Sequence, residues 1–152
     1  MTCTTISRNR QQRPPLRAVP AGERVFDLRL EHGLLAPAAA RHQARPVLAA
    51  WGLDEEQLYD ALLVISELVT NAVTHALPPV VLHLHAAADD SRQVQVHVSD
   101  GGPQPTPGTW AATRPADEHG RGTGIVSALT DHAGTDSDTE GLIDHWADLT
   151  AA

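Results

Sequence analysis

The stretch between Leu58 and Ala76 constrains the fold of this chain more than any other. Its apolar residues recur every three or four positions, which places them on one wide stripe of a helix. The residues of this stripe are Leu58, Ala61, Leu62, Ile65, Val69, Ala72, Val73 and Ala76. A stripe of this width needs an apolar partner, which a sheet supplies. We therefore predict a long helix over residues 54–76, capped by Asp54, that packs against a β-sheet.

Three polar residues follow the flank of this stripe at intervals of four. Glu67, Asn71 and His75 lie one above the other on a helix of this register. A carboxylate and a carboxamide one turn apart suit a hydrated divalent cation, because Asn offers a neutral oxygen ligand while Glu holds a water or accepts a proton. The alternative is an amphipathic helix with polar residues at its edge, and this stretch alone does not decide between the two.

Residues that alternate between apolar and polar indicate strands on both sides of this helix. Before it, residues 24–30 form a predicted half-buried strand, and residues 38–51 form a predicted Ala-rich helix. Pro46 lies inside the Ala-rich helix and should kink or divide it. After the long helix, residues 80–88 and 93–99 alternate about a short polar turn, so we expect them to pair as a hairpin.

The two faces of this hairpin differ in chemical character. Its predicted buried face consists of Leu82, Leu84, Val94, Val96 and Val98. The opposite face carries His83, His85 and His97. A sheet covered by helices on one side leaves its other face to water or to a second subunit, where histidine is tolerated. Because no Cys, Asp or Glu joins these histidines at a recognisable ligand spacing, we do not expect a metal site there.

The hairpin runs directly into Asp100-Gly101-Gly102. An Asp at the end of a buried strand is placed to accept a hydrogen bond inside a cleft, and glycines after it let a flat ligand approach the backbone. A plain Asp-Gly turn is the alternative. Residues 103–119 hold four prolines and show no periodicity, which is typical of a functional lid or a disordered insert.

That connection closes on Gly120-Arg121-Gly122-Thr123-Gly124, which is followed by apolar residues at helical spacing. Glycines that lead into a helix expose backbone N–H groups to an anion, and the helix dipole favours negative charge there. Arg121 would add a charge-assisted contact to phosphate. A dinucleotide fingerprint is not indicated, because this glycine run follows a lid rather than a strand and comes late in the chain.

The last elements complete a two-layer pattern. A short strand is predicted over residues 134–139 and a final one over 141–149, whose apolar contributions are Leu142 or Ile143, His145 or Trp146, and Leu149. The order strand, helix, helix, two strands, lid, helix, two strands implies an α/β sandwich with helices on one face of the sheet.

The charge of the chain is unevenly placed and excludes several classes of function. Residues 1–20 carry four arginines and no acid, so the net charge of −8 divides into +4 for this tail and −12 for the remainder. An acidic body argues against a nucleic-acid surface. The tail is expected to be disordered, ahead of a single domain over residues 21–152. All eleven basic residues are Arg, which excludes a Walker-type phosphate loop and a Schiff-base or catalytic lysine.

Several features predict a cytoplasmic location. No apolar run approaches the length of a membrane span, and the N-terminus lacks the apolar core of a signal peptide. The single cysteine, Cys3, lies in the tail, where it cannot form an internal disulfide.

Three of these segments together resemble a known family. Glu67-Leu68-Val69-Thr70-Asn71-Ala72, Asp100-Gly101-Gly102 and Gly120-Arg121-Gly122-Thr123-Gly124, in this order and spacing, resemble the N, G1 and G2 boxes of the GHKL ATP-binding superfamily. Within it, the chain most resembles the small actinobacterial regulators related to anti-sigma factor serine kinases. The resemblance covers about residues 23–150. It implies the Bergerat-type fold, a two-layer α/β sandwich with a mixed, mostly antiparallel sheet.

The resemblance also implies a role for each box in binding ATP and Mg²⁺. Asn71 would bind the Mg²⁺ that bridges the phosphates, and Glu67 would be the general base that activates a serine hydroxyl or a water. Asp100 would accept a hydrogen bond from the adenine amino group, and Gly102 would give the base room. The phosphates would be held by Gly120, Arg121, Thr123 and the other glycines of their box, Gly122 and Gly124. His75 matches a histidine common in this subgroup and is grouped with the nucleotide-binding residues without an assigned role.

Two departures from the family pattern affect these expectations. The subgroup's last strand usually holds a Gly-Lys-Thr-like turn before its Trp, whereas the segment from Gly141 to Trp146 has no Thr to help bind adenine. The predicted lid is also rich in proline. We therefore predict that the chain binds a nucleotide, whether or not it also transfers a phosphoryl group from it.

The resemblance leaves two functions open. The first is a protein serine kinase that binds a sigma factor and phosphorylates a serine on its antagonist, an anti-anti-sigma protein. The second is a binding module in which ATP orders the lid and no phosphate is transferred. A homodimer is left open, and direct contact with nucleic acid or a membrane is not expected.

Overall fold

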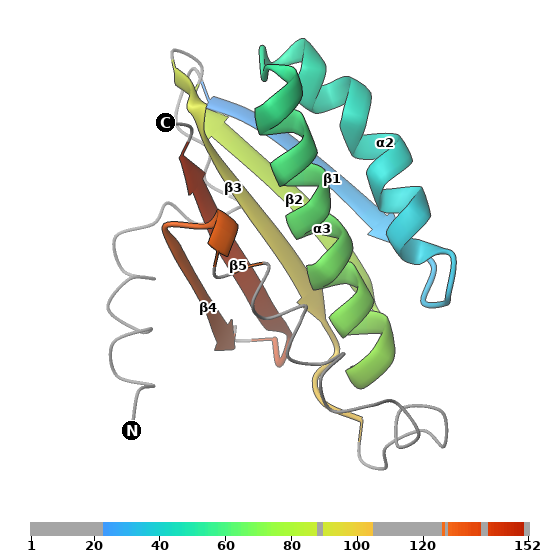
Figure 1. Cartoon of the computed structure of the whole chain (residues 1–152). Coiled ribbons are helices and arrows are strands. Elements are labelled where there is room, and N and C mark those ends of the chain that lie inside the picture. The colour runs from blue at the N-terminus through green and yellow to red at the C-terminus, as the bar shows by residue number, and fades with distance from the viewer. Residues whose placement is uncertain (1–22, 88–89, 105–125, 127, 138–139, 151–152) are drawn as a thin grey trace.

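The computed structural model describes residues 23–87, 90–104, 126, 128–137 and 140–150. Within them, five strands form one sheet in the order β1-β2-β3-β5-β4, and every neighbouring pair is antiparallel. The elements are β1 (Glu23–Leu30), α2 (Ala36–Ala50), α3 (Glu55–His75), β2 (Val80–Ala87), β3 (Asp90–Asp100), β4 (His132–Ser137) and β5 (Ile143–Thr150). Both helices cover the same face of the sheet (Figure 1). The predicted two-layer α/β sandwich is confirmed.

The long helix α3 lies within one residue of its predicted bounds at each end, and its first turn carries a reciprocal cap between Asp54 and Gln57. The Asp54 carboxylate accepts from the Gln57 backbone N–H at 2.8 Å, and the Gln57 side chain accepts from the Asp54 backbone N–H at 2.8 Å. This reciprocal pair satisfies two N–H groups that a helix start leaves without partners. Glu55 and Glu56 add negative charge at the positive end of the helix dipole.

Helix α2 continues through Pro46, so of the two predicted effects, a kink or a division, the division does not occur. Proline removes one backbone hydrogen bond and crowds the preceding turn. Pro46 lies on the exposed side of α2, as does His42, whose carbonyl proline leaves without a donor and which can instead accept from solvent. On the other side, Ala44 and Leu48 are fully buried in the core, and their packing holds the helix together across the proline.

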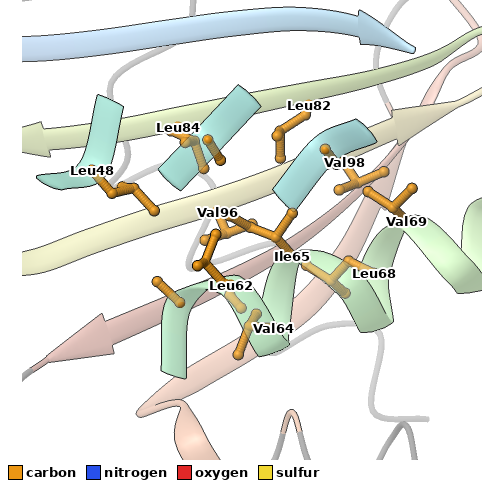
Figure 2. Packing of buried hydrophobic residues seen from close by; sticks show 14 of the residues in the cluster. Leu48, Leu62, Val64, Ile65, Leu68, Val69, Leu82, Leu84, Val96 and Val98 are labelled. Atoms are coloured by element: carbon orange, nitrogen blue, oxygen red, sulfur yellow. The ribbon is translucent and has the colours of Figure 1, made fainter. Parts of the chain in front are cut away.

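The core lies between the helices and one face of the sheet. Every residue of the predicted apolar stripe of α3 is buried. Figure 2 shows Ile65 and Val69 of α3 directed toward Leu82, Val96 and Val98 of the sheet, and all five side chains are fully buried. Burying side chains of this size contributes about 1.5–3 kcal/mol each. This interface therefore fixes α3 over the central strands of the sheet.

The strand boundaries shift by a few residues from those predicted. β3 begins at Asp90, inside the predicted turn, and a register shift falls between Ala86 and Ala87 of its partner β2. β4 and β5 each begin two residues away from their predicted starts. The described residues after the glycine-rich box, Val126, Ala128 and Leu129, are helical, as predicted.

The outer face of the sheet carries the three histidines, as predicted, but they are not left to water. His83 contacts Asp27 at 2.7 Å, His97 contacts Asp144 at 2.7 Å, and His85 contacts Glu23. Their side chains are only 6–18% exposed. The expectation of water or a second subunit missed these pairs because each carboxylate comes from a neighbouring strand, at a register that the sequence does not state.

Two further features bear on the expected classes of function. Among the residues that the structure describes, no group of three or more His, Cys, Asp or Glu side chains is arranged to hold a metal ion. None of the described helices is both long and apolar enough to cross a membrane.

Candidate functional site

A pocket of about 340 Å³ opens where α3, β3 and the start of β5 meet. It is lined by Asn71, His75, Ala76, Asp100, Pro103, Ile143 and His145. Its volume lies within the range of small-molecule sites, roughly 300–1,000 Å³. Three residues predicted from sequence, one from the end of β3 and two from α3, are thereby brought to one place.

Asp100 reaches this pocket because it continues the buried face of β3. Val94, Val96 and Val98 point toward the helices, and the period of two places Asp100 on the same face at the end of the strand. Asp100 is only 1% exposed. A buried carboxylate requires hydrogen-bond donors, because leaving it without them is costly.

Two donors from within the protein satisfy the Asp100 carboxylate. The Gly102 backbone N–H donates to Oδ1 at 2.8 Å, and His145 Nε2 lies 2.8 Å from Oδ2. A carboxylate offers about four acceptor positions, so these two contacts leave capacity for a further N–H donor in the pocket.

The glycine after Asp100 makes room for the protein's own backbone rather than for a ligand. A Cβ on Gly101 would lie 2.2 Å from the carbonyl oxygen of Pro78. The Gly101 N–H donates to the Leu77 carbonyl at 2.7 Å, and the Leu77 N–H donates to the Gly102 carbonyl at 2.8 Å. Gly102 has φ +92°, a conformation that residues with a side chain rarely adopt. The loop is therefore tied to the end of α3, which fixes Asp100 relative to Asn71.

The first two residues of the predicted lid are also bound to the C-terminal end of α3. Pro103 forms a β-bridge with Ala76, and the Gln104 backbone N–H donates to the His75 carbonyl at 3.0 Å. The Gln104 side chain donates to the Ala76 carbonyl at 3.2 Å. Residues 105–119 of the predicted lid lie outside the described residues, as does the predicted phosphate-binding box, Gly120, Arg121, Gly122, Thr123 and Gly124.

The three flank residues of α3 do not all face the pocket. Asn71 and His75 line it and are exposed. Glu67 lies one turn nearer the start of α3, is half-buried, and is not among the lining residues. The intervals of four place these side chains in one row, but the pocket reaches only the last two of them.

His145 is a residue of the site that sequence reasoning did not assign. The choice between His145 and Trp146 as the inward-facing residue of the last strand was left open, and the structure places His145 inward. A signal for this existed, because counting back by twos from buried Leu149 reaches Ala147, His145 and Ile143 on one face. His145 contacts Asp100 and belongs to the segment from Gly141 to Trp146, which holds no Thr.

Comparison with known proteins gives a family and a fold. A family model described as "Histidine kinase-like ATPase domain" matches residues 34–143. Thirteen chains of solved structures match, among them the crystal structure of the RsbU and RsbW domains of Rv1364c from Mycobacterium tuberculosis. The TM-score is 0.63 at 23% sequence identity, and the match covers 84% of this chain but 32% of that one. No curated protein matches the chain.

Proposed function

Because the chain belongs to the histidine kinase-like ATPase domain family, we propose that its pocket binds ATP together with Mg²⁺. The observation that carries this proposal is the buried Asp100, which lines the same pocket as Asn71. The family match includes both residues. The pocket thus holds both an acceptor for a base N–H group, on Asp100, and a neutral oxygen of the kind that Mg²⁺ accepts, on Asn71.

Each residue then has a distinct task. Asp100 accepts the hydrogen bond from the adenine 6-amino group, and the loop at Gly102 borders the base. Asn71 holds the cation, with water completing the coordination that Mg²⁺ prefers. The phosphates are assigned to the box at 120–124, of which Arg121 supplies a positive charge. When bound, ATP supplies a transferable phosphoryl group, and Mg²⁺ offsets the phosphate charge.

At a finer level, we propose a cytoplasmic regulator that binds a sigma factor and phosphorylates a serine of an antagonist protein. The resemblance of the three boxes to anti-sigma factor serine kinases supports this reading, and so does the fold shared with the structure that contains an RsbW domain. In this reading Glu67 acts as the general base for the attacking hydroxyl.

A second candidate function is an ATP-gated binding module that transfers no phosphate. The position of Glu67, half-buried and outside the pocket lining, favours it. A general base must come within hydrogen-bond reach of the hydroxyl that it deprotonates. If Glu67 stays where it is when ATP is bound, ATP acts only by stabilising the conformation that binds a partner.

Calorimetry with ATP, with and without Mg²⁺, tests the binding site. Wild type should bind ATP more tightly with Mg²⁺, and Asn71→Ala should lose that dependence because it lacks the oxygen ligand. Gln95→Ala is a matched control, since it removes a carboxamide that contacts His85 on the outer face of the sheet. Equal ATP affinity of wild type with and without Mg²⁺ would contradict the role of Asn71, and absence of ATP binding would refute the proposed function.

Glu67→Gln distinguishes the kinase from the binding module. The substitution keeps the size of the side chain and removes its basicity, so ATP affinity and partner binding should persist. Phosphoryl transfer to an antagonist captured from the native host should fall by roughly a hundredfold to ten-thousandfold, as expected for a lost general base. A wild type that transfers no phosphate, or a variant as fast as wild type, would leave the binding module as the better account.

A further inference from the structure

We propose that His145 is a positioning residue for base recognition: it holds the Asp100 carboxylate in the orientation that selects an amino-purine over an oxo-purine. This inference rests on the proposed function, because it concerns the base end of the same ATP site. It assigns a new task to a residue of β5 that lies far along the chain from the Asp-Gly-Gly segment.

The geometry gives His145 two partners, one on each ring nitrogen. Nε2 lies 2.8 Å from Asp100 Oδ2, and Nδ1 lies 3.2 Å from Thr135 Oγ1 on β4. A carboxylate only accepts hydrogen bonds, so Nε2 carries a proton and donates it to Asp100. In the neutral ring Nδ1 is then an acceptor, and the Thr135 hydroxyl donates to it. The three side chains form a relay across β4, β5 and β3.

This relay limits how the Asp100 carboxylate can turn. The Gly102 N–H donates to one oxygen and His145 donates to the other. Rotation of the carboxylate about the Cβ–Cγ bond of Asp100 would therefore break one contact or both. The remaining acceptor positions belong to a residue that lines the pocket. An exocyclic amino group placed there would donate to the carboxylate, whereas a carbonyl oxygen would face a second acceptor and be repelled. A fixed carboxylate therefore discriminates between adenine and guanine.

The position of His145 separates this role from a purely structural one. Its side chain is 32% exposed while that of Asp100 is 1% exposed, and both residues line the pocket. The histidine is therefore the more exposed partner of the pair, and both partners remain within reach of a ligand in the pocket. A ligand base that contacts Asp100 also lies beside the imidazole ring.

The test compares two substitutions of His145 that differ by one methylene group. In His145→Gln the side-chain amide reaches about as far as Nε2 and still donates to Asp100, whereas in His145→Asn it is too short. We expect His145→Asn to weaken ATP binding by about tenfold, the loss of one positioning hydrogen bond. His145→Gln should stay within about threefold of wild type because it replaces that bond.

Calorimetry of each variant uses three probes in the presence of Mg²⁺: ATP, GTP and inorganic tripolyphosphate. His145→Asn should lose ATP affinity and ATP-over-GTP preference while binding tripolyphosphate like wild type, because the relay acts only on the base. His97→Ala serves as the control, since it removes an equivalent histidine from the outer face and should leave all three affinities unchanged. Thermal unfolding of every variant shows that it is folded under the conditions of the assay.

The outcomes separate the inference from the function on which it rests. If wild type binds ATP but His145→Asn binds ATP as wild type does, the inference fails and the proposed function stands. Equal losses for ATP and tripolyphosphate, or equal losses in the Gln and Asn variants, would also overturn it, because both indicate a general structural effect. If wild type itself binds no adenine nucleotide, the proposed function fails and the inference with it.

Discussion

Two histidine–carboxylate pairs connect β3 to β5 from opposite faces of the sheet. On the outer face His97 contacts Asp144 at 2.7 Å, and on the helix face His145 contacts Asp100 at 2.8 Å. The consecutive residues Asp144 and His145 of β5 point to opposite faces, so each strand supplies one acid and one histidine. The two pairs are alike in chemistry and in length.

They differ in which partner is buried. In the outer pair the histidine side chain is 6% exposed and the carboxylate 19% exposed. In the inner pair the order is reversed, with the histidine at 32% and the carboxylate at 1%. The outer carboxylate is also approached by the Ser99 hydroxyl at 3.4 Å. In the outer pair, the carboxylate of Asp144 covers the buried His97, and the contact joins two strands. In the inner pair, the buried carboxylate of Asp100 lines the pocket and can still accept a hydrogen bond from a ligand.

Residue types alone do not distinguish the site from the rest of the sheet. Contacts of the same kind join His83 to Asp27 and His85 to Glu23 on the outer face, whereas the pair of His145 and Asp100 lines the pocket. What distinguishes that pair is its place at the end of β3, next to the end of α3.

The largest effect is expected for Asp100→Asn. The substitution replaces an acceptor-only group with one that is half donor, so it loses the charge-assisted bond from His145 and from an incoming amino group. Affinity for ATP should fall by roughly ten- to a hundredfold, corresponding to about 1.5–3 kcal/mol for a hydrogen bond to a charged group. Calorimetry with ATP measures this loss of affinity. Tripolyphosphate binding should hardly change, and equal losses for both ligands would show that Asp100 acts structurally.

An intermediate effect is expected for Asp144→Asn, and it should appear in stability rather than in binding. Removing the charge weakens the contact to the buried His97 ring, which should lower the free energy of unfolding by about 1–3 kcal/mol. Urea denaturation measures this loss. ATP affinity should equal that of wild type, because the outer face does not line the pocket. A weakened ATP site in this variant would show that the two pairs are coupled through β5.

The smallest effect is expected for Asp27→Asn, whose side chain is 58% exposed although it contacts His83. Water screens this contact, so the free energy of unfolding should change by no more than about 0.5 kcal/mol. The same urea experiment provides the value. A loss as large as that of Asp144→Asn would mean that exposure of the carboxylate does not decide the strength of these pairs.

Local patterns in the sequence predicted most of the fold. The apolar stripe and Asp54 placed α3 within a residue at each end, because a stripe of period 3.6 and an N-cap are set by neighbours along the chain. Alternation placed Asp100 on the buried face of β3 for the same reason. The proposed nucleotide site, with Asn71, His75 and Asp100 in one pocket, followed from these local rules and the resemblance of the boxes.

The tertiary structure alone decided the contacts that depend on strand register and loop path. Local patterns do not predict that Asp144 meets His97, that His145 meets Asp100, or that Gly101 lies against the Pro78 carbonyl. These contacts join residues 23 to 47 positions apart, and a shift of one residue in the pairing of β3 with β5 would turn every side chain to the other face. The chain's local chemistry determined which groups are available for binding, and the packing of α3 on the sheet determined which of them meet at one pocket.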